Sequence, residues 1–203
     1  MAEITAAAVN ELRKQTGVPM MDCKKALADA GGDMEKAKVL LRERGIAKGA
    51  SRADRETAFG RFGIFCGAKE KAGAIVELKC ESAPVTQNEE FIEFCNDLAK
   101  QLAASPDVKT ADDLLAKPSS TKPGMTLGDV KNDLFNRIRE VFNVGRFARI
   151  EGPTGGYSHN SGTVAGVLLS VEGSGDDEAA KDICMHIAAM RPKATSKDEI
   201  DPE

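Results

Sequence analysis

The sequence predicts an α+β fold, in which three short helices are followed by a core built on two similar strand–helix units. In the first unit, residues 73–104, apolar residues alternate with Glu77 and Lys79 and later recur at helical spacing. The second unit, a strand at 163–170 and a helix at 177–190, repeats this order about 90 residues later. This recurrence and the helical pattern at the N-terminus define the fold class.

Glycine and proline positions delimit the three N-terminal helices. Gly17 follows the first helix and suits the left-handed conformation that commonly ends a helix. Pro19 opens the second helix in its first turn, where a missing N–H costs nothing. Asp33 is predicted to cap the third helix, and Gly45 is predicted to close it. The apolar faces of the three helices are expected to hold Ile4, Ala8, Val9, Leu12, Met20, Cys23, Leu27, Ala30, Ala37, Leu40 and Leu41.

Four segments are predicted along the chain. They are a three-helix domain at 1–45, a charged and solvated linker helix at 46–60, a first core subdomain at 61–143, and a second core subdomain at 144–203.

The core is predicted to contain a hairpin, two helices, a strand, a turn, and then the second strand–helix unit. Asn88 is predicted to cap the first of these helices, and Thr126 and Asp129 form a capping-box pattern at the start of the second. Ile183, Ile187 and Met190 are expected on the packed face of the last helix. The predicted ranges are 61–66 with 74–80, 88–104, 126–141, 144–151, 152–156, 163–170 and 177–190.

The composition argues against several classes of function. The net charge of −4 does not suit a general nucleic-acid binder, which would carry a basic excess. No apolar run approaches the ~20 residues of a membrane span, and the N-terminus resembles neither a signal nor a transit peptide. The five cysteines are scattered without a CxxC pair, which is typical of reduced cytosolic thiols and predicts no metal site. We therefore expect a cytoplasmic protein.

The sequence gives little support to catalysis. His159 and His186 are the only histidines, and neither lies in a nucleophile triad order or an HExxH motif. No cysteine has a histidine or a second cysteine nearby in sequence, so a thiol enzyme is unsupported. We expect no enzyme, no cofactor and no metal. His186 is read as a packing or surface residue, whereas a functional role for His159 stays open.

The adjacent pair Met20–Met21 is a candidate contact surface. Neighbouring positions on a helix point about 100° apart, so both side chains cannot face one small core. We expect one of the two in the core and the other exposed, where a flexible thioether suits a partner's groove.

The stretch LRKQTGVPMMDCKKALADAGGDMEKAKVLLRERG, residues 12–45, closely resembles the N-terminal signature of the bacterial elongation factor Ts family. The resemblance continues at NEEF (88–91), at YSH (157–159) and at DICMHIAAMRP (182–192). It implies that the three N-terminal helices form a ubiquitin-associated-like domain. It also implies guanine-nucleotide exchange on elongation factor Tu, by binding the GDP form and promoting GDP release.

The same resemblance implies a set of partner-binding residues. Leu12, Arg13, Met20 and Met21 match positions that press on the GTP-binding domain of elongation factor Tu, and Tyr157 and His159 match a second contact. The elbow that precedes the first core helix matches the segment that dislocates the partner's magnesium, and it comprises Ser82, Ala83, Pro84 and Val85.

The chain departs from the family pattern at three places. The family's elbow reads close to Cys-Glu-Thr-Asp-Phe-Val-Ala-Lys-Asn, so Ala83 and Pro84 replace its acidic–aromatic pair. Arg139 stands where the family tends to have Gly. The sequence also stops at Glu203, where family members usually continue, so this is either a shortened member or a truncated chain.

A second hypothesis follows from the altered elbow. The chain would then be a non-catalytic, translation-associated binding module or adaptor with weakened exchange activity. The partner that the resemblance implies is elongation factor Tu, and no direct contact to nucleic acid or membrane is expected. A homodimer or a 2:2 complex is left open.

Overall fold

The computed structural model describes residues 4–52, 54–161, 163–173 and 176–200. The chain divides into two compact units, each assembled from three separate stretches. The helical unit comprises Met1–Phe59, Cys80–Phe94 and Ala116–Asn143, and the sheet unit comprises Gly60–Lys79, Cys95–Leu115 and Val144–Glu203. Three N-terminal helices precede a mixed core, which confirms the α+β class. The predicted domain boundaries stay a prediction.

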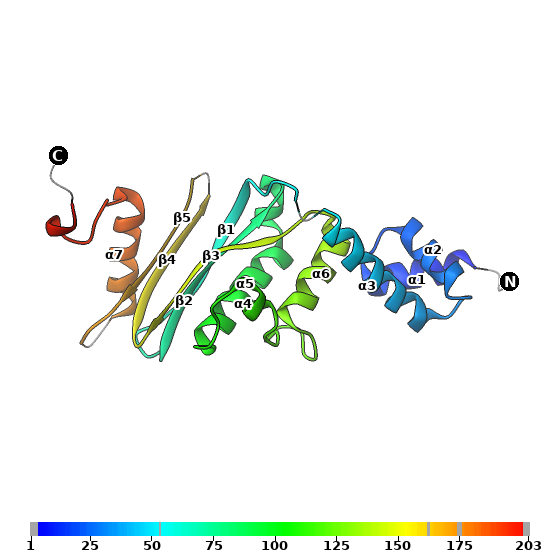
Figure 1. Cartoon of the computed structure of the whole chain (residues 1–203), viewed down its shortest axis with the longest axis horizontal. Helices are drawn as coiled ribbons and strands as arrows, with labels where there is room; N and C mark the ends of the chain where they lie inside the picture. Colours follow the sequence, from blue (N-terminus) through cyan, green and yellow to red (C-terminus); the bar gives the residue numbers. More distant parts are fainter. Residues whose placement is uncertain (1–3, 53, 162, 174–175, 201–203) are drawn as a thin grey trace. The chain divides into compact units, whose positions relative to one another are not determined.

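The helical unit begins with three helices around one apolar core (Figure 1). These are α1 (Ala6–Thr16), α2 (Met20–Asp29) and α3 (Met34–Ala50). The Thr5 hydroxyl caps α1 by accepting from the Ala8 N–H at 3.2 Å, and Gly17 ends it with φ 67°, as predicted. The buried core consists of Val9, Leu12, Val18, Cys23, Ala26, Leu27, Ala37 and Leu41.

Gly45 does not close α3, so that prediction is wrong. The helix continues to Ala50, and Gly45 is buried within it. The linker helix predicted at 46–60 is therefore wrong beyond Ala50, where α3 ends. A Cβ at Gly45 would lie 1.9 Å from Oδ1 of Asn136, which belongs to α6 (Leu127–Ile138). The glycine is therefore a point of close helix contact rather than a helix end.

Helix α6 is fastened to the N-terminal helices by ion pairs. The predicted capping box is present, since Thr126 and Asp129 exchange bonds between side chain and backbone N–H. The Thr126 N–H and then the Arg42 guanidinium hold the pKa of Asp129 below its usual range. Arg139 ends α6 in the left-handed conformation, earlier than predicted, and pairs with Asp22 of α2. The three N-terminal helices and α6 thus belong to one packed body.

The sheet unit contains a three-stranded sheet in the order β1 (Phe59–Phe65), β2 (Ala72–Cys80), β3 (Asn143–Glu151). The predicted face of β2 is confirmed, because Ala74, Val76 and Leu78 are fully buried. Helix α4 (Glu89–Ala104) covers this face, and the Cys95 thiol lies 3.9 Å from the carbonyl oxygen of Val76. The short helix α5 (Ala111–Leu115) follows it.

A hairpin covers the other face of this sheet. Strand β4 (Thr154–Ser161) pairs antiparallel with β5 (Thr163–Ser170), with Thr154 opposite Ser170. The predicted turn at 152–156 is too long, because β4 already starts at Thr154. A Cβ at Gly156 would lie 2.7 Å from the Ile64 side chain of β1, so glycine permits the two sheets to approach closely.

Helix α7 (Asp177–Met190) packs on the outer face of the hairpin, and Figure 1 shows the resulting layers of the sheet unit. Its expected packed face is wrong at Ile183 and Met190, which are 55% and 68% exposed, whereas Ile187 is half-buried. The buried residues are instead Ala180 and Cys184. A Cβ at Gly155 of β4 would lie 2.6 Å from that of Ala180, so this close contact accepts only small side chains. Ile183 and Met190 are left facing outward.

The contact between α3 and α6 gives the first testable prediction. Replacing glycine by alanine inside a helix usually stabilises it by about 1 kcal/mol. In Gly45→Ala, however, the new methyl group overlaps Asn136, and overpacking of this kind costs about 1–3 kcal/mol. The free energy of unfolding, measured by urea denaturation, should therefore fall.

The control is the same substitution made in an Asn136→Ala background, where the overlapping amide is absent. There Gly45→Ala should cost less or become stabilising, because the two sites are coupled. Equal losses in both backgrounds would contradict the contact.

Candidate functional site

The start of α2 presents both methionines to solvent. Met20 is 44% and Met21 62% exposed, so the expectation that one of them lies in the core is wrong. The core face of α2 is formed by Cys23, Ala26 and Leu27 instead. Pro19 precedes the first turn without a side-chain capping bond. Two unbranched, adaptable side chains therefore stand together at an exposed helix start.

Two other residues predicted for this surface differ in accessibility. Arg13, on α1, is exposed, whereas Leu12 has no exposed surface and belongs to the helical core. Leu12 can act on a partner only by supporting its neighbours from beneath. The exposed set Arg13, Met20 and Met21 is called the methionine surface below.

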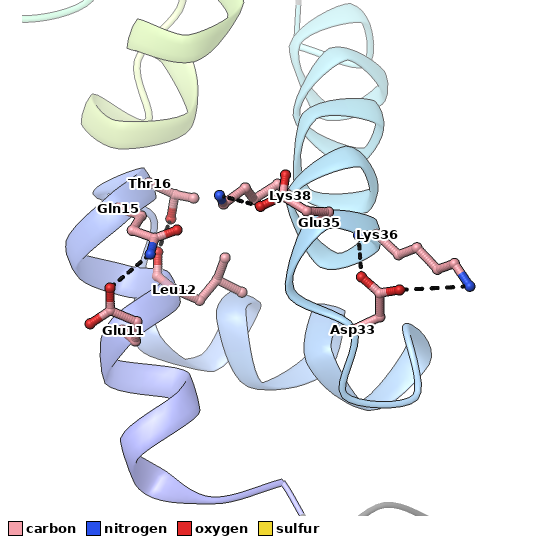
Figure 2. A network of polar contacts seen from close by, with 8 residues as sticks. All are labelled: Glu11, Leu12, Gln15, Thr16, Asp33, Glu35, Lys36 and Lys38. Atoms are coloured by element: carbon pink, nitrogen blue, oxygen red, sulfur yellow. Dashed lines mark hydrogen bonds and ion pairs between the residues drawn. The ribbon is translucent and has the colours of Figure 1, made fainter.

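Figure 2 shows that many polar side chains on α1 and α3 are already paired within their own helix. Gln15 donates to Glu11 at 2.7 Å, and Lys38 pairs with Glu35 at the same distance. The Asp33 carboxylate accepts from the Lys36 N–H at 3.0 Å and caps α3, as predicted. Exposed pairs of this kind contribute little to stability. They stabilise the helices locally and do not indicate where a partner binds.

The elbow between β2 and α4 is a 3-10 turn, η1 (Ala83–Gln87). Ala83 and Pro84 are exposed at its tip, and Val85 is buried beneath them. The Thr86 hydroxyl donates to the Ala83 carbonyl at 2.7 Å. The tip is therefore a short, hydrogen-bonded turn that is held in place by the buried side chain of Val85.

The end of the elbow leads directly into α4. The Asn88 side chain accepts from the Phe91 N–H at 3.2 Å, which confirms the predicted N-cap of this helix. The Phe91 ring in turn packs on Phe142, with ring centroids 5.4 Å apart.

Two carboxylates hold the base of the elbow. Glu140 accepts from the Ser82 N–H at 3.0 Å and from the Ser82 hydroxyl at 2.5 Å. Glu81 accepts from the Val141 N–H at 2.8 Å and from Arg55 at 3.0 Å. Partial burial raises the pKa of Glu81, but the N–H and the guanidinium outweigh it and hold that pKa below its usual range. Sequence reasoning missed Glu81 and Glu140, because no local pattern marks a contact 58 residues apart.

Tyr157 and His159 lie together on β4, on the side that faces α7. The Tyr157 hydroxyl is 3.2 Å from Nδ1 of His159, and His159 stands opposite Ala165 of β5. Both side chains line a hollow of about 490 Å³ between the hairpin and the last turns of α7. The sequence did not indicate its other lining residues, which are Ala165, Met185, Ala188, Ala189 and Arg191. His186 is exposed on α7 and does not line this hollow.

The thiols show no sign of activation. All five cysteines are free, and burial raises the pKa of Cys184 and Cys80 to about 11 and of Cys95 to about 12. Among the residues that the structure describes, no group of three or more His, Cys, Asp and Glu side chains is placed to hold a metal ion. In the same described ranges, no helix is long and apolar enough to span a bilayer.

Comparison with known proteins identifies the family of the chain. The family model for Elongation factor TS matches residues 81–203. Elongation factor Ts of Bordetella parapertussis is 41% identical over 200 residues, covering 98% of this chain and 66% of that protein. The chain belongs to the elongation factor Ts family. The family member of Clostridioides difficile is also 41% identical, over 209 residues, covering all of this chain and 68% of the relative. The member from Azoarcus sp. is 42% identical over 205 residues. The chain thus spans about two thirds of the length of the relatives it matches.

The orientation of β4 gives the second prediction. His159 is exposed on one face, whereas Asn160 on the other face accepts from the Phe62 N–H at 2.9 Å and donates to the Phe62 carbonyl at 3.3 Å. His159→Ala should change the unfolding free energy by no more than about 0.5 kcal/mol. Asn160→Ala removes the partners of two backbone groups and should cost about 1–3 kcal/mol. Thermal melts followed by circular dichroism compare the two, and equal losses would contradict this orientation.

Proposed function

We propose that this chain binds elongation factor Tu in its GDP form and promotes release of the GDP, so that GTP can bind. Membership of the elongation factor Ts family over nearly the whole chain supports this function. The observation that carries it is the placement of two exposed features, the methionine surface and the elbow tip, within the same helical unit. Tyr157 and His159 supply a further contact in the proposal.

In this proposal the chain performs no bond chemistry. The sequence contains no GxxxxGK[ST] loop for a nucleotide phosphate, so the nucleotide is bound by the partner alone. An exchange factor binds the nucleotide-free partner more tightly than the loaded partner, and this difference in affinity favours release of GDP. The coupling is reciprocal, so excess GDP should displace the factor.

The methionine surface is assigned to docking. Met20 and Met21 expose flexible thioether side chains, which adapt to an apolar groove. Arg13 of α1 adds an exposed positive charge in the same unit, while buried Leu12 supports α1 from the core. A few well-packed anchors usually carry most of an interface's energy, and methionine and arginine are enriched at interfaces.

The elbow tip is assigned to disturbance of the partner's nucleotide site. Its exposed residues are Ala83 and Pro84, which offer neither a carboxylate nor an aromatic ring. Ser82 and Val85 flank them as hydrogen-bonded and buried supports. This small tip favours slow exchange. It also sustains the second candidate function, a non-catalytic translation-associated adaptor that binds the partner with weakened exchange activity.

Docking through the methionine surface gives the third prediction. Met20→Ala together with Met21→Ala should weaken binding to elongation factor Tu by more than about tenfold, because anchor residues commonly contribute over ~2 kcal/mol. The melting temperature should stay unchanged, since both side chains are exposed. Titration calorimetry measures the affinity, and Arg13→Ala should weaken binding in the same direction.

Val39→Ala is a matched control, because Val39 is an apolar residue of α3 with 56% exposure outside the methionine surface. This variant should retain full affinity. An equal loss in the control, or no loss in the methionine variant, would remove Met20 and Met21 from the interface.

The elbow gives the fourth prediction, which separates the two candidate functions. Burying a Phe side chain contributes roughly 1.5–3 kcal/mol, and a tenfold rate change corresponds to about 1.4 kcal/mol. Ala83→Asp combined with Pro84→Phe should therefore accelerate GDP release by about one to two decades at similar affinity. Stopped-flow release of fluorescent GDP at saturating factor measures this rate.

Gln87→Ala, an exposed position of the same turn, is the control and should leave the rate unchanged. Fast release by the wild type with no gain in the double variant would show that other contacts carry the exchange. Binding without any acceleration by the wild type would favour the adaptor.

A further inference from the structure

At the base of the elbow, residues 81–82 and residues 140–141 hydrogen-bond to one another through two carboxylates, and this arrangement is called the clamp below. Glu140 reaches across to the backbone N–H and hydroxyl of Ser82, and Glu81 reaches back to the N–H of Val141. Each segment thus contributes one carboxylate that grips the backbone of the other. Both oxygens of Glu140 are used, one for each donor of Ser82.

This clamp holds the backbone at the start of the elbow. Ser82 is extended, with φ −133° and ψ 151°, and it immediately precedes the exposed tip. Bonds to a carboxylate are roughly twice as strong as bonds between neutral groups, and paired bonds add geometric specificity. Buried Val85 fixes the other side of the tip. Only Ala83 and Pro84 lie exposed between these two fixed points.

We propose that Glu140 is a positioning residue for nucleotide exchange, which holds Ser82 so that the elbow tip is presented to the partner in one conformation. This inference rests on the function proposed above. Glu140 acts through Ser82 and not by contact with nucleotide. Holding the tip in its bound conformation reduces the ordering that binding would otherwise require.

The positioning role of Glu140 and the docking role of the methionine surface should affect different kinetic quantities. Docking residues set the concentration at which the factor saturates its partner. A positioning residue of the elbow changes the rate reached at saturation, because the tip acts only when the nucleotide site is disturbed. Exchange kinetics therefore separate the two roles.

The test uses Glu140→Gln and Ser82→Ala, alone and combined, in the full chain with elongation factor Tu and fluorescent GDP. Glu140→Gln should lower the release rate at saturation by about tenfold, the factor expected for losing one hydrogen bond to a charged group. The half-saturating concentration should stay within about twofold. The double variant should lose no more than Glu140→Gln, because both substitutions break the same bonds.

Glu93→Gln is the matched control. Glu93 is an exposed carboxylate of α4 in the same unit, outside the clamp and the proposed interface. It should leave the release rate unchanged. If Glu140→Gln keeps the wild-type rate, or if the losses of the two single variants multiply, the positioning role is overturned.

Amide hydrogen exchange of the free chain keeps this test independent of the proposed function. The amides of residues 85–88 should exchange faster in Ser82→Ala and Glu140→Gln than in wild type or Glu93→Gln. Unchanged exchange would overturn the clamp, whatever the partner does. Faster amide exchange together with a wild type that releases no GDP would instead overturn the proposed function and leave the clamp as a local structural device.

Discussion

Contact between the backbone of α3 and the side chain of Asn136 in α6 is the constraint on which the helical unit depends. Because Gly45 has no Cβ, α6 can approach α3 closely enough for Arg42 to reach Asp129 and for Asp22 to reach Arg139. These ion pairs are partly exposed and contribute up to about 1 kcal/mol each. The glycine determines how closely α3 and α6 approach, and the ion pairs orient the two helices. The three N-terminal helices and the elbow belong to the same unit.

In the sheet unit, a glycine again permits two elements to approach closely, but the result is different. Gly155 admits Ala180 of α7 so closely that only small side chains fit between the helix and the hairpin. Ile183 and Met190 of α7 face outward, although a hydrophobic pattern alone assigns them to the core. Farther along the helix, a hollow remains over Tyr157 and His159. The packing is therefore close at the N-terminal end of α7, and Tyr157 and His159 stay accessible beside its C-terminal end.

The sequence predicted those features that depend on local periodicity. The buried side of β2, the cap at Asn88 and the capping box at Thr126 were all correct, because neighbouring residues determine each of them. Gly45 was misread, since one sequence cannot distinguish a helix end from a close contact. Strand β4 is rich in Gly, Ser and Asn, which disfavour strands, and its place is determined by the layers on both sides. The clamp at Glu140 was invisible for the same reason, because tertiary contacts alone create it.

Arg139 connects the packing of the N-terminal helices to the elbow. A non-glycine residue in the left-handed conformation costs about 1–2 kcal/mol, and the Arg139 backbone has φ 70°. The ion pair of its side chain with Asp22 contributes up to about 1 kcal/mol and so offsets part of this cost. The left-handed turn ends α6, and the next residue is Glu140, which holds Ser82. The contact that fixes α6 therefore also fixes where Glu140 lies, and through Ser82 it determines how the elbow tip is presented.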